Sequence, residues 1–356
     1  MKIISDFSKD TQTLKPNPGS YEWWYFDAVS DDGYSIVIIF YEGNPFSRKY
    51  IESLHARNQP DATQFPAISI SVYDNGNPLF YSFEEFLPDS AGFSSSKPGG
   101  HAGNNHFEGV KNGNNLVYNI HLDQTLVNGD SLRGDLTFSL DSSTKINSDI
   151  LTSGSDNSNH TWNLVMPKCK AEGEIRIEGY REAHFLFKGT GYHDHNTGFE
   201  PMKESFKEWY WGRYHTQNGT FIYYLMNKVN AWDNQAWYIG DDGNIEKLNS
   251  RIEKKNENLN IFGLTSARVL EFDGNEISAF LQKDTLLDNG PFYQRFEGKL
   301  LLKIDDTLEQ ATGISEYIYP SRIYSKTFWP LVNMRIKYPD KTHWVQKSPL
   351  LYRWTW

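Results

Sequence analysis

The stretch Tyr21-Glu-Trp-Trp-Tyr-Phe-Asp27 decides how this chain is organised, because a close copy of it occurs further along. Glu22-Trp-Trp-Tyr25 returns as Glu208-Trp-Tyr-Trp211, an offset of 186 positions from 22 to 208, and both copies precede a glycine and an apolar run. A second pair, His106-Phe-Glu-Gly109 and Arg295-Phe-Glu-Gly298, lies at an offset of 189 positions from 107 to 296. Two matches in the same order predict a tandem duplication.

The sequence between these motifs alternates short runs of β-branched and aromatic residues with Gly, Asn and Asp turns, which is typical of antiparallel strands. Helical periodicity is nearly absent, and residues 245–258 are the one ambiguous stretch. Segments 90–105 and 142–160 are rich in Ser, Gly and Asn and are expected to be long surface loops. The clearest strand candidates are residues 34–42, 68–72, 116–122, 174–177, 220–229, 267–272, 299–304 and 333–338. The chain is therefore expected to be all-β, with two barrels or sandwiches in tandem.

Composition excludes several classes of protein. At 356 residues the chain is long enough for two domains, and a formal net charge of -10 argues against binding to nucleic acid or to an anionic membrane surface. The single cysteine, Cys169, cannot form an intrachain disulfide, and the first residues have no apolar signal core, so a cytoplasmic location is expected. No glycine loop of the nucleotide-binding types occurs between a strand and a helix, so no cofactor is expected.

A dense polar cluster lies between Gly189 and Gly198 and reads Tyr192-His-Asp-His-Asn196 at its centre. Consecutive polar side chains between glycines are poor core material, because each buried polar atom needs a partner. On an extended backbone Tyr192, Asp194 and Asn196 share one face, whereas the two histidines share the other.

This cluster permits three interpretations. Asp194 could be a proton donor whose pKa is raised by apolar walls. His193 and His195 could bind a metal with a third ligand such as His184 or His215, but the sequence supplies no clear third ligand and no metal is expected. The cluster could also be a satisfied hydrogen-bond network that fixes a turn between two domains.

Several separated motifs resemble the carotenoid 1,2-hydratase (hydroxyneurosporene synthase) and AttH-like family. They are residues 21–27, Gly-Tyr-His-Asp-His-Asn at 191–196, Trp-Tyr-Trp-Gly-Arg at 209–213 and Gly-Ile-Ser-Glu-Tyr at 313–317, followed by Pro320-Ser-Arg322. The resemblance implies two lipocalin-like antiparallel β-barrels with an apolar cavity. Thr197 stands where hydratase members commonly carry tryptophan, so the substrate could differ from a long carotenoid.

The resemblance also implies where the site lies. We expect an N-terminal barrel over residues 1–188 and a C-terminal barrel over 189–356, with the polar cluster at the junction. Asp194 matches the acidic residue of the family motif and is the expected acid, with Tyr192, His193 and His195 as further catalytic residues. The expected substrate-binding residues are Trp23, Trp24, Tyr25, Asn196, Trp209, Trp211, Arg213, Glu316 and Arg322.

Two pairs of charges carry further hypotheses. The repeat offset makes Asp27 equivalent to Arg213, and these opposite charges could meet near the contact between the barrels or form an ordinary solvated pair. Glu316 and Arg322 match the family pattern and could be a structural ion pair or a clamp at the mouth of a cavity.

The expected function is cofactor-independent hydration, or cyclisation begun by protonation, at a C=C bond of an apolar isoprenoid or polyene. Two alternatives stay open: a pericyclase that folds a linear polyene, and a non-catalytic lipocalin-type carrier of apolar ligands. The expected partner is an apolar small molecule, with peripheral association with a membrane or a carrier protein and no nucleic acid.

Overall fold

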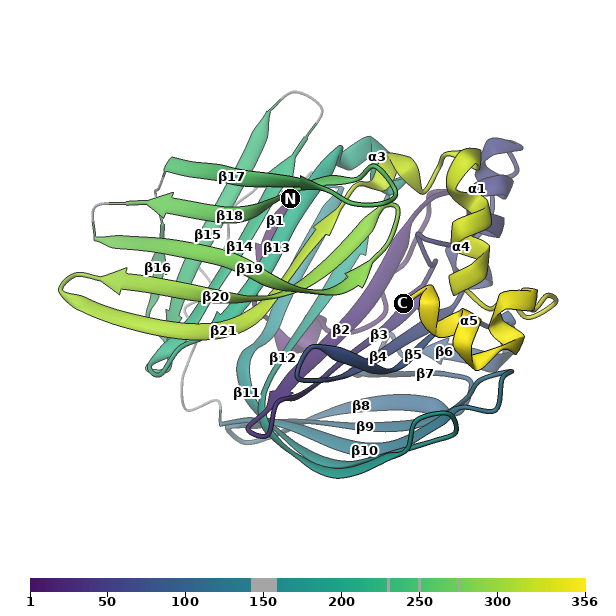
Figure 1. Cartoon of the computed structure of the whole chain (residues 1–356), viewed down its shortest axis with the longest axis horizontal. Helices are drawn as coiled ribbons and strands as arrows, with labels where there is room; N and C mark the ends of the chain where they lie inside the picture. The colour runs from purple at the N-terminus through teal and green to yellow at the C-terminus, as the bar shows by residue number, and fades with distance from the viewer. Residues whose placement is uncertain (142–158, 229–230, 249–250, 275) are drawn as a thin grey trace. The chain divides into compact units, whose positions relative to one another are not determined.

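Two curled antiparallel β-sheets make up most of this protein (Figure 1). The structure is a computed structural model that describes residues 1–141, 159–228, 231–248, 251–274 and 276–356. Contacts divide the described chain into unit 1, with residues 1–141, 159–202 and Lys326–Trp356, and unit 2, with Lys203–Ser325. The predicted fold class, all-β with two tandem lipocalin-like barrels, is confirmed.

Unit 1 contains one sheet and several short helices. Its sheet has the order β5-β4-β3-β2-β12-β11-β10-β9-β8-β7-β6, and β1 pairs in parallel with β11. The strands are β1 (Lys2–Ile4), β2 (Tyr21–Ser30), β3 (Tyr34–Glu42), β4 (Ala67–Asp74), β5 (Asn77–Glu85), β6 (Ala91–Phe93), β7 (Gly99–Ala102), β8 (Asn105–Asn112), β9 (Asn115–Thr125), β10 (Ser131–Asp141), β11 (His160–Glu178) and β12 (Ala183–Gly198). The helices of this part are α1 (Arg48–His55), α4 (Trp329–Arg335) and α5 (Pro349–Trp354), and α3 (Met202–Ser205) begins at its last residue before unit 2.

Unit 2 repeats most of this sheet. Its order β16-β15-β14-β13-β21-β20-β19-β18-β17 matches β5-β4-β3-β2-β12-β11-β10-β9-β8 strand for strand. The strands are β13 (Glu208–His215), β14 (Gly219–Asn227), β15 (Trp232–Gly240), β16 (Ile245–Lys247), β17 (Arg251–Leu259), β18 (Thr265–Asp273), β19 (Ile277–Asn289), β20 (Tyr293–Ile304) and β21 (Thr307–Ile318). The identical order confirms the predicted duplication and makes β13 the counterpart of β2, as the repeated Glu-Trp motif predicts. The second sequence match was wrong, because residues 106–109 lie on β8, whose counterpart is β17, whereas residues 295–298 lie on β20, the counterpart of β11.

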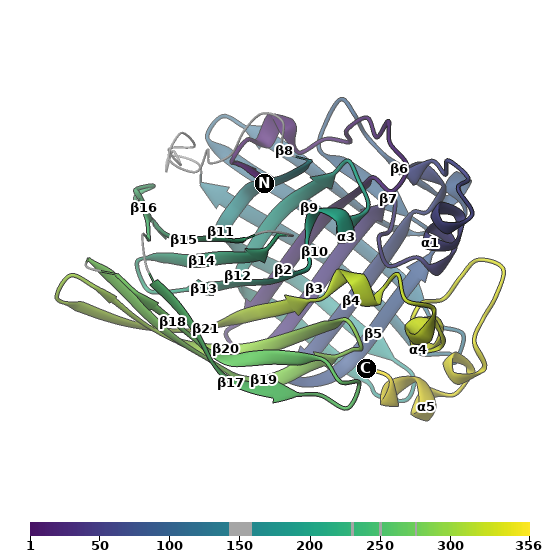
Figure 2. The same ribbon diagram turned by 90° about the horizontal axis from the view of Figure 1, so that it is seen from above.

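Each sheet curls until strands far apart in its order pack against each other, as the view from above shows (Figure 2). In unit 1 the Phe107 ring on β8 lies 5.4 Å from Phe26 on β2 and 4.9 Å from Phe40 on β3, centroid to centroid. In unit 2 the Phe272 ring on β18 lies 5.2 Å from Phe221 on β14. Aromatic side chains on the inner faces therefore hold each curled sheet together.

The hairpin between β4 and β5 shows how local sequence sets the register. Asp74 pairs with Asn77, which leaves a two-residue loop of Asn75 and Gly76. These two residues have φ of 46° and 78°, the left-handed conformation that a two-residue hairpin turn requires. Asn-Gly is a residue pair that favours this type of turn.

One sequence-based expectation about loops was wrong, and one stretch that the sequence leaves ambiguous is a strand region. Segment 90–105 is not a long loop, because it contains the short strands β6 and β7. The glycines of this segment obscure the alternation typical of a strand. They also allow close packing, because Gly100 lies opposite Phe93 and a Cβ at Gly100 would lie 2.3 Å from that ring. The ambiguous residues 245–258 form β16 and most of β17. Residues 142–158 of the other expected loop lie outside the described residues.

The short helices were also missed. Residues 333–338 were expected to be a strand, but α4 covers Trp329–Arg335, with Pro330 in its first turn, where proline is favoured. Helix α1 begins after Ser47, whose side chain accepts a hydrogen bond from the Tyr50 amide. Helices of two turns give too few residues for a clear 3.6-residue pattern. No helix in the described part of the chain is long and apolar enough to cross a membrane.

The division into units differs from the expected boundary between residues 188 and 189, which lies inside β12. Residues 189–202 stay with unit 1, because β12 pairs with β2 from Gly189 to Gly198. Lys326–Trp356 also returns to unit 1. The Lys337 amide donates to the Phe83 carbonyl, and the Glu85 amide donates to the Lys337 carbonyl, both at 2.9 Å.

Gly189→Ala is expected to destabilise unit 1. A Cβ at Gly189 would lie 2.0 Å from the Val29 carbonyl oxygen and 2.6 Å from the Ser30 Cα, so β12 and β2 would have to separate. We expect a loss of about 1–3 kcal/mol in the free energy of unfolding, measured by urea titration of the circular dichroism. Gly92→Ala is the control, because its Cβ would meet only the His101 side chain, at 3.0 Å. Equal stability of the two variants would contradict this packing.

Candidate functional site

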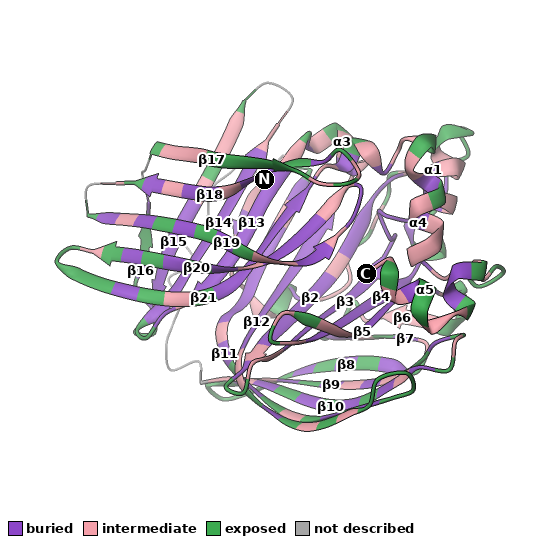
Figure 3. Ribbon diagram, in the orientation of Figure 1, coloured by how far each residue is buried: buried purple, intermediate pink, exposed green. Residues whose placement is uncertain are grey.

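The second half of β12 presents polar side chains on both of its faces, as the sequence predicts. Asp194 pairs with Tyr25 and Asn196 pairs with Trp23, so these four residues share one face of the sheet. His195 pairs with Trp24 and lies on the opposite face. Both faces are buried here, whereas β8, β9 and β10 alternate buried and exposed residues (Figure 3).

Asp194 is the acceptor at the centre of the first face. Its Oδ2 accepts hydrogen bonds from Trp162 Nε1 at 2.7 Å and from the Tyr192 hydroxyl at 2.6 Å. Its Oδ1 accepts from Asn196 Nδ2 at 2.9 Å. The side chain is only 4 % exposed. All three donors belong to buried side chains of β11 and β12. We call Trp162, Tyr192, Asp194 and Asn196 the Asp194 site.

Two members of this site have distinct roles. Burial, followed by the charge of Asp194, raises the pKa of Tyr192 well above its ordinary value, so the phenol stays protonated and donates. Trp162 was missed by sequence reasoning because it lies on β11, and only the pairing of Trp162 with Asn196 brings its indole to Asp194. No local sequence signal marks that pairing.

The aromatic residues of the Tyr21–Asp27 motif divide between the two faces. Tyr25 meets Tyr192 edge to face, with ring centroids 6.1 Å apart. Trp23 stacks on Tyr21 at 5.3 Å. Trp24 instead stacks on His195, 4.7 Å away on the opposite face. Of the three aromatic residues expected to bind substrate here, Trp23 and Tyr25 therefore share the face of Asp194.

The two histidines belong to a buried network on that opposite face. His193 Nε2 lies 3.0 Å from Asp10 Oδ2, and its ring stacks on Phe26 with centroids 3.9 Å apart. His195 Nδ1 lies 3.2 Å from Asp10 Oδ1, and its Nε2 lies 2.8 Å from Glu22 Oε1. The structure thus places both imidazoles, which were expected to be catalytic, on the other side of the sheet from Asp194.

The N-terminal segment balances the charges of this network. Lys15 pairs with Glu22 at 2.6 Å and also with Glu42, and its side chain is 2 % exposed. Burial alone would raise the pKa of Asp10, but the charges and hydrogen bonds of the two histidines hold it at about 2. Burial would lower the pKa of His195, but its hydrogen bonds to Asp10 and Glu22 raise it to about 9. The interpretation of a satisfied structural network fits this face.

Thr197 lies on the same side as the histidines. Its hydroxyl donates to Glu22 Oε1 at 3.1 Å. The residue that departs from the family motif therefore contacts the ionic network rather than the face of Asp194.

The expected third metal ligands are elsewhere. His184 is exposed on the far part of β12 and hydrogen-bonds Glu174 at 2.5 Å. His215 belongs to unit 2, where its ring lies 2.9 Å from the Thr220 hydroxyl. Within residues 1–141, 159–228, 231–248, 251–274 and 276–356, no three His, Cys, Asp or Glu side chains are grouped to hold a metal ion.

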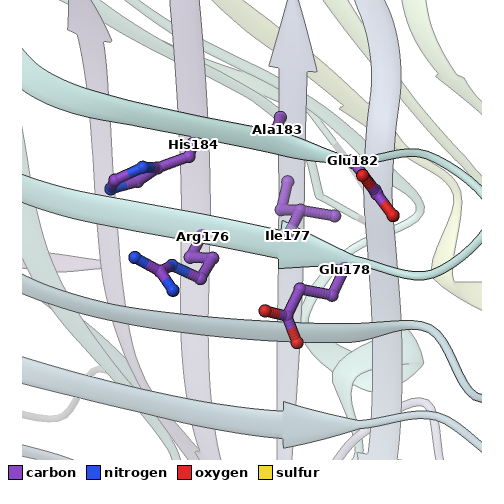
Figure 4. Close-up of a pocket in the computed structure, with 6 residues that line it drawn as sticks. All are labelled: Arg176, Ile177, Glu178, Glu182, Ala183 and His184. Atoms are coloured by element: carbon purple, nitrogen blue, oxygen red, sulfur yellow. The ribbon is translucent and has the colours of Figure 1, made fainter.

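A surface pocket lies at the end of the β11–β12 hairpin (Figure 4). It is lined by Arg176, Ile177, Glu178, Glu182, Ala183 and His184. Its charged side chains are exposed and of mixed sign, and it lies ten positions, roughly 30 Å, along β12 from Asp194. We therefore treat it as separate from the Asp194 site.

Unit 2 contains a counterpart of the Asp194 site. Tyr25 pairs with Asp194 in unit 1, and Trp211, its repeat equivalent, pairs with Glu316 in unit 2. Glu316 Oε1 accepts from the Tyr293 hydroxyl at 2.6 Å, as Asp194 accepts from Trp162. Glu316 also accepts from Arg295 Nε at 3.0 Å, so this carboxylate is ion-paired.

The other predicted residues of unit 2 have separate surroundings. Trp209, Trp211 and Arg213 alternate along β13 and are all buried. Trp209 meets Phe206 edge to face, with centroids 5.3 Å apart. Arg322 donates to the carbonyls of loop residues 262, 263 and 291.

Asp27 and Arg213 are both fully buried, so the alternative of a solvated pair was wrong. The contact between the Asp27 and Arg213 side chains stays a prediction.

Comparisons with known proteins match the chain to the carotenoid hydratase family. A family model described as "Carotenoid hydratase CrtC" matches residues 110–347. A protein named hydroxyneurosporene dehydrogenase, from Chlorobaculum tepidum, is 27 % identical over 351 residues, covering 92 % of this chain and 89 % of that protein. An acyclic carotenoid 1,2-hydratase from Thiocapsa roseopersicina is 27 % identical over 225 residues, covering 59 % of this chain and 48 % of that protein.

Solved structures share the fold at low sequence identity. A putative AttH protein from Nitrosomonas europaea has a TM-score of 0.59 at 13 % identity, covering 89 % of this chain and 97 % of that one. CghA in complex with Sch210972 has a TM-score of 0.55 at 11 % identity, covering 89 % and 98 %. These similarities support the two-barrel architecture.

His195→Gln is expected to destabilise the protein more at pH 6 than at pH 9.5. Because the pKa of His195 rises from 6.5 to about 9 on folding, its contribution is complete below pH 6.5 and is lost as the pH passes about 9. The difference from wild type in the free energy of unfolding should shrink by about 2–3 kcal/mol over this range, measured by urea titration of tryptophan fluorescence.

His184→Gln is the control for this experiment, since it removes an exposed imidazole from the same strand. It should change stability little at either pH. A His195→Gln effect that is equal at both pH values would show that His195 is not charged in the folded protein.

Proposed function

The chain belongs to the carotenoid hydratase family, and from this premise we propose that it adds water to a C=C bond of an apolar isoprenoid or polyene. As a member of this family it is an enzyme of the hydratase, or hydro-lyase, class. The observation that carries the proposal is the Asp194 site, a buried carboxyl group with aromatic side chains on the same face of the sheet.

Asp194 is the best candidate for the proton donor. Protonation of an unactivated alkene produces a carbocation, so the reaction needs a strong acid that is shielded from water. Tyr192 is a weaker acid than a free phenol, because burial and the charge of Asp194 raise its pKa. The indole of Trp162 and the amide of Asn196 do not ionise in this range. An apolar substrate that displaces one donor from Asp194 would shift this carboxyl group toward its protonated form.

The proposed reaction returns the acid to its starting state. Asp194 transfers its proton to one alkene carbon, and the positive charge develops on the other. Faces of aromatic rings such as Trp23 and Tyr25 can stabilise this cation by about 0.5–2 kcal/mol each. Water then adds to the cation, and Asp194 accepts the proton that water releases. The sum is alkene plus water to alcohol.

Asp194→Asn should lower turnover by about 10²–10⁴-fold, because an amide cannot donate the proton. Product formation would be measured on a panel of acyclic carotenoids and isoprenoids in ¹⁸O-labelled water. Wild-type product should carry the label. Asp135→Asn is the control, since its side chain is 82 % exposed on β10 and it should retain activity.

The same experiment separates the alternatives. An unlabelled isomer that still forms in the Asp194→Asn variant would contradict hydration and indicate a pericyclase. Binding without product in the wild type would indicate a carrier. Trp162→Phe and Tyr192→Phe should each reduce turnover less than Asp194→Asn, because each removes one donor and leaves the acid.

An exposed apolar patch offers a way to reach an apolar substrate. Trp344, Leu350, Leu351 and Trp354 are 65, 60, 43 and 75 % exposed, and they lie on or beside the short helix Trp344–Lys347 and α5. Residues 341–356 include three Lys or Arg and no Asp or Glu, although the chain as a whole has a net charge of -10. We propose that this C-terminal patch docks on an anionic lipid bilayer, where tryptophan and leucine enter the interface and lysines meet the headgroups.

The double substitution Trp344→Ser, Trp354→Ser should reduce binding to vesicles of phosphatidylcholine and phosphatidylserine by about tenfold or more, because two aromatic anchors are lost. Co-sedimentation would measure the bound fraction. Leu186→Ser is the control, since this residue is 74 % exposed on β12, away from the patch in sequence. Equal binding of all three proteins would contradict docking through the patch.

A further inference from the structure

A buried lysine occupies a core position inside unit 2. Lys283 lies on β19 on the same side as Ala279 and Leu281, which belong to the apolar core, and it is 2 % exposed. Its Nζ has no hydrogen-bond partner among the residues that the structure describes. The ammonium position lies 4.7 Å from the ring centroids of both Tyr210 and Phe296. A lysine is rare in such a position unless it is paired.

A second cation lies beside it. Val269 on β18 pairs with Gln282 on β19, so continuing this register places Arg268 opposite Lys283. The Arg268 guanidinium lies 4.5 Å from the Phe296 ring centroid. Within the described parts of the chain it forms no ion pair or hydrogen bond. Like charges at opposite cross-strand positions destabilise a sheet, so the pair is unexpected in a purely structural core.

A buried cationic side chain in unit 1 has acidic partners, whereas Arg268 and Lys283 have none among the described residues. In unit 1 the buried His195 lies within hydrogen-bond distance of two carboxylates, Asp10 and Glu22. In unit 2 the equivalent of Glu22 is Glu208, which accepts a hydrogen bond from Tyr317 at 2.6 Å and another from Asn227. Glu208 is therefore engaged elsewhere. Aromatic faces compensate Lys283 only in part, since a cation–π contact does not replace the hydrogen bonds that an ammonium group loses on burial.

We propose that the interior of unit 2 binds the carboxylate of an apolar acid, with Arg268 and Lys283 holding its oxygens. Two adjacent cations select an anion, and a guanidinium fits the geometry of a carboxylate. The surrounding side chains, including Tyr210, Phe296 and Leu281, are aromatic or aliphatic and suit an apolar chain. This site is separate from the Asp194 site and does not depend on the proposed hydration.

Binding at this site should be coupled to protonation. Burial, followed by the charge of Arg268, holds the pKa of Lys283 well below its ordinary value, so its charged form is disfavoured until an anion binds. The groups that face it are Arg268 from β18 and the Tyr210 phenol from β13, with Lys254 of β17 on the same Tyr210 ring at 5.7 Å. A bound carboxylate would favour the ammonium form, so the affinity should fall as the pH rises.

The test compares palmitic acid with methyl palmitate on the full chain by isothermal titration calorimetry. These two probes share the same apolar chain and differ in the charge of the head group. We expect the acid to bind about 10- to 100-fold more tightly than the ester, the factor expected for one hydrogen bond to a charged group. Lys283→Met and Arg268→Gln should each remove this preference.

Lys303→Met is the matched control, because Lys303 is exposed on β20, and it should keep the preference. Equal affinities for acid and ester, no binding of either, or a preference that survives Lys283→Met would each overturn the proposal. Lys283→Met replaces a buried cation with an apolar side chain of similar length and should fold. If it does not, Arg268→Gln gives the same comparison at a partly exposed position.

Discussion

The pairing of β12 with both β2 and β11 is the constraint on which the rest of unit 1 depends. This strand carries five polar residues in succession, from Tyr192 to Asn196, and both of its faces are buried. Alternate residues of this strand therefore need hydrogen-bond partners on opposite faces of the sheet. On the first face Trp162 of β11 donates a hydrogen bond to Asp194. On the second face Glu22 of β2 is the hydrogen-bond partner of His195. A register slip of one residue would exchange the two sets and leave both without partners.

The duplication explains why only one unit carries the proposed acid. Register makes Asp194 and Glu316 equivalent, and each accepts a hydrogen bond from an aromatic donor on the neighbouring strand. They differ in one neighbour, since Glu316 is ion-paired with Arg295 whereas Leu164 pairs with Asp194 at the corresponding position. A fixed guanidinium stabilises a carboxylate and opposes its protonation. The shared fold thus supports an acid in unit 1 and a fixed charge in unit 2.

The sequence predicted the fold better than the site. A few consecutive residues are enough to identify the repeated Glu-Trp motif and the Asn75-Gly76 turn, so the duplication and the β4–β5 hairpin could be predicted. The alternation of Asp194 against His195 also follows from an extended strand. The partners of those residues could not be predicted, because Asp10 and Trp162 come from distant segments and are joined to β12 only by strand pairing and folding of the N-terminal segment. The same limit applies to Lys283, since one lysine among apolar residues on β19 has no local signature of burial.

The two interiors also differ in how they compensate buried charge, and this difference bears on what each can bind. In unit 1 the segment before β2 inserts Asp10 and Lys15, which complete an ionic network with the histidines. The chain itself therefore supplies the counter-ions of that network. In unit 2 the buried cation Lys283 meets aromatic faces and Arg268 instead. An uncompensated charge is costly inside a protein, and an anion that enters would regain part of that cost. Carboxylates of the chain itself therefore compensate the buried cations of unit 1. The interior of unit 2 is suited to a ligand that brings a carboxylate.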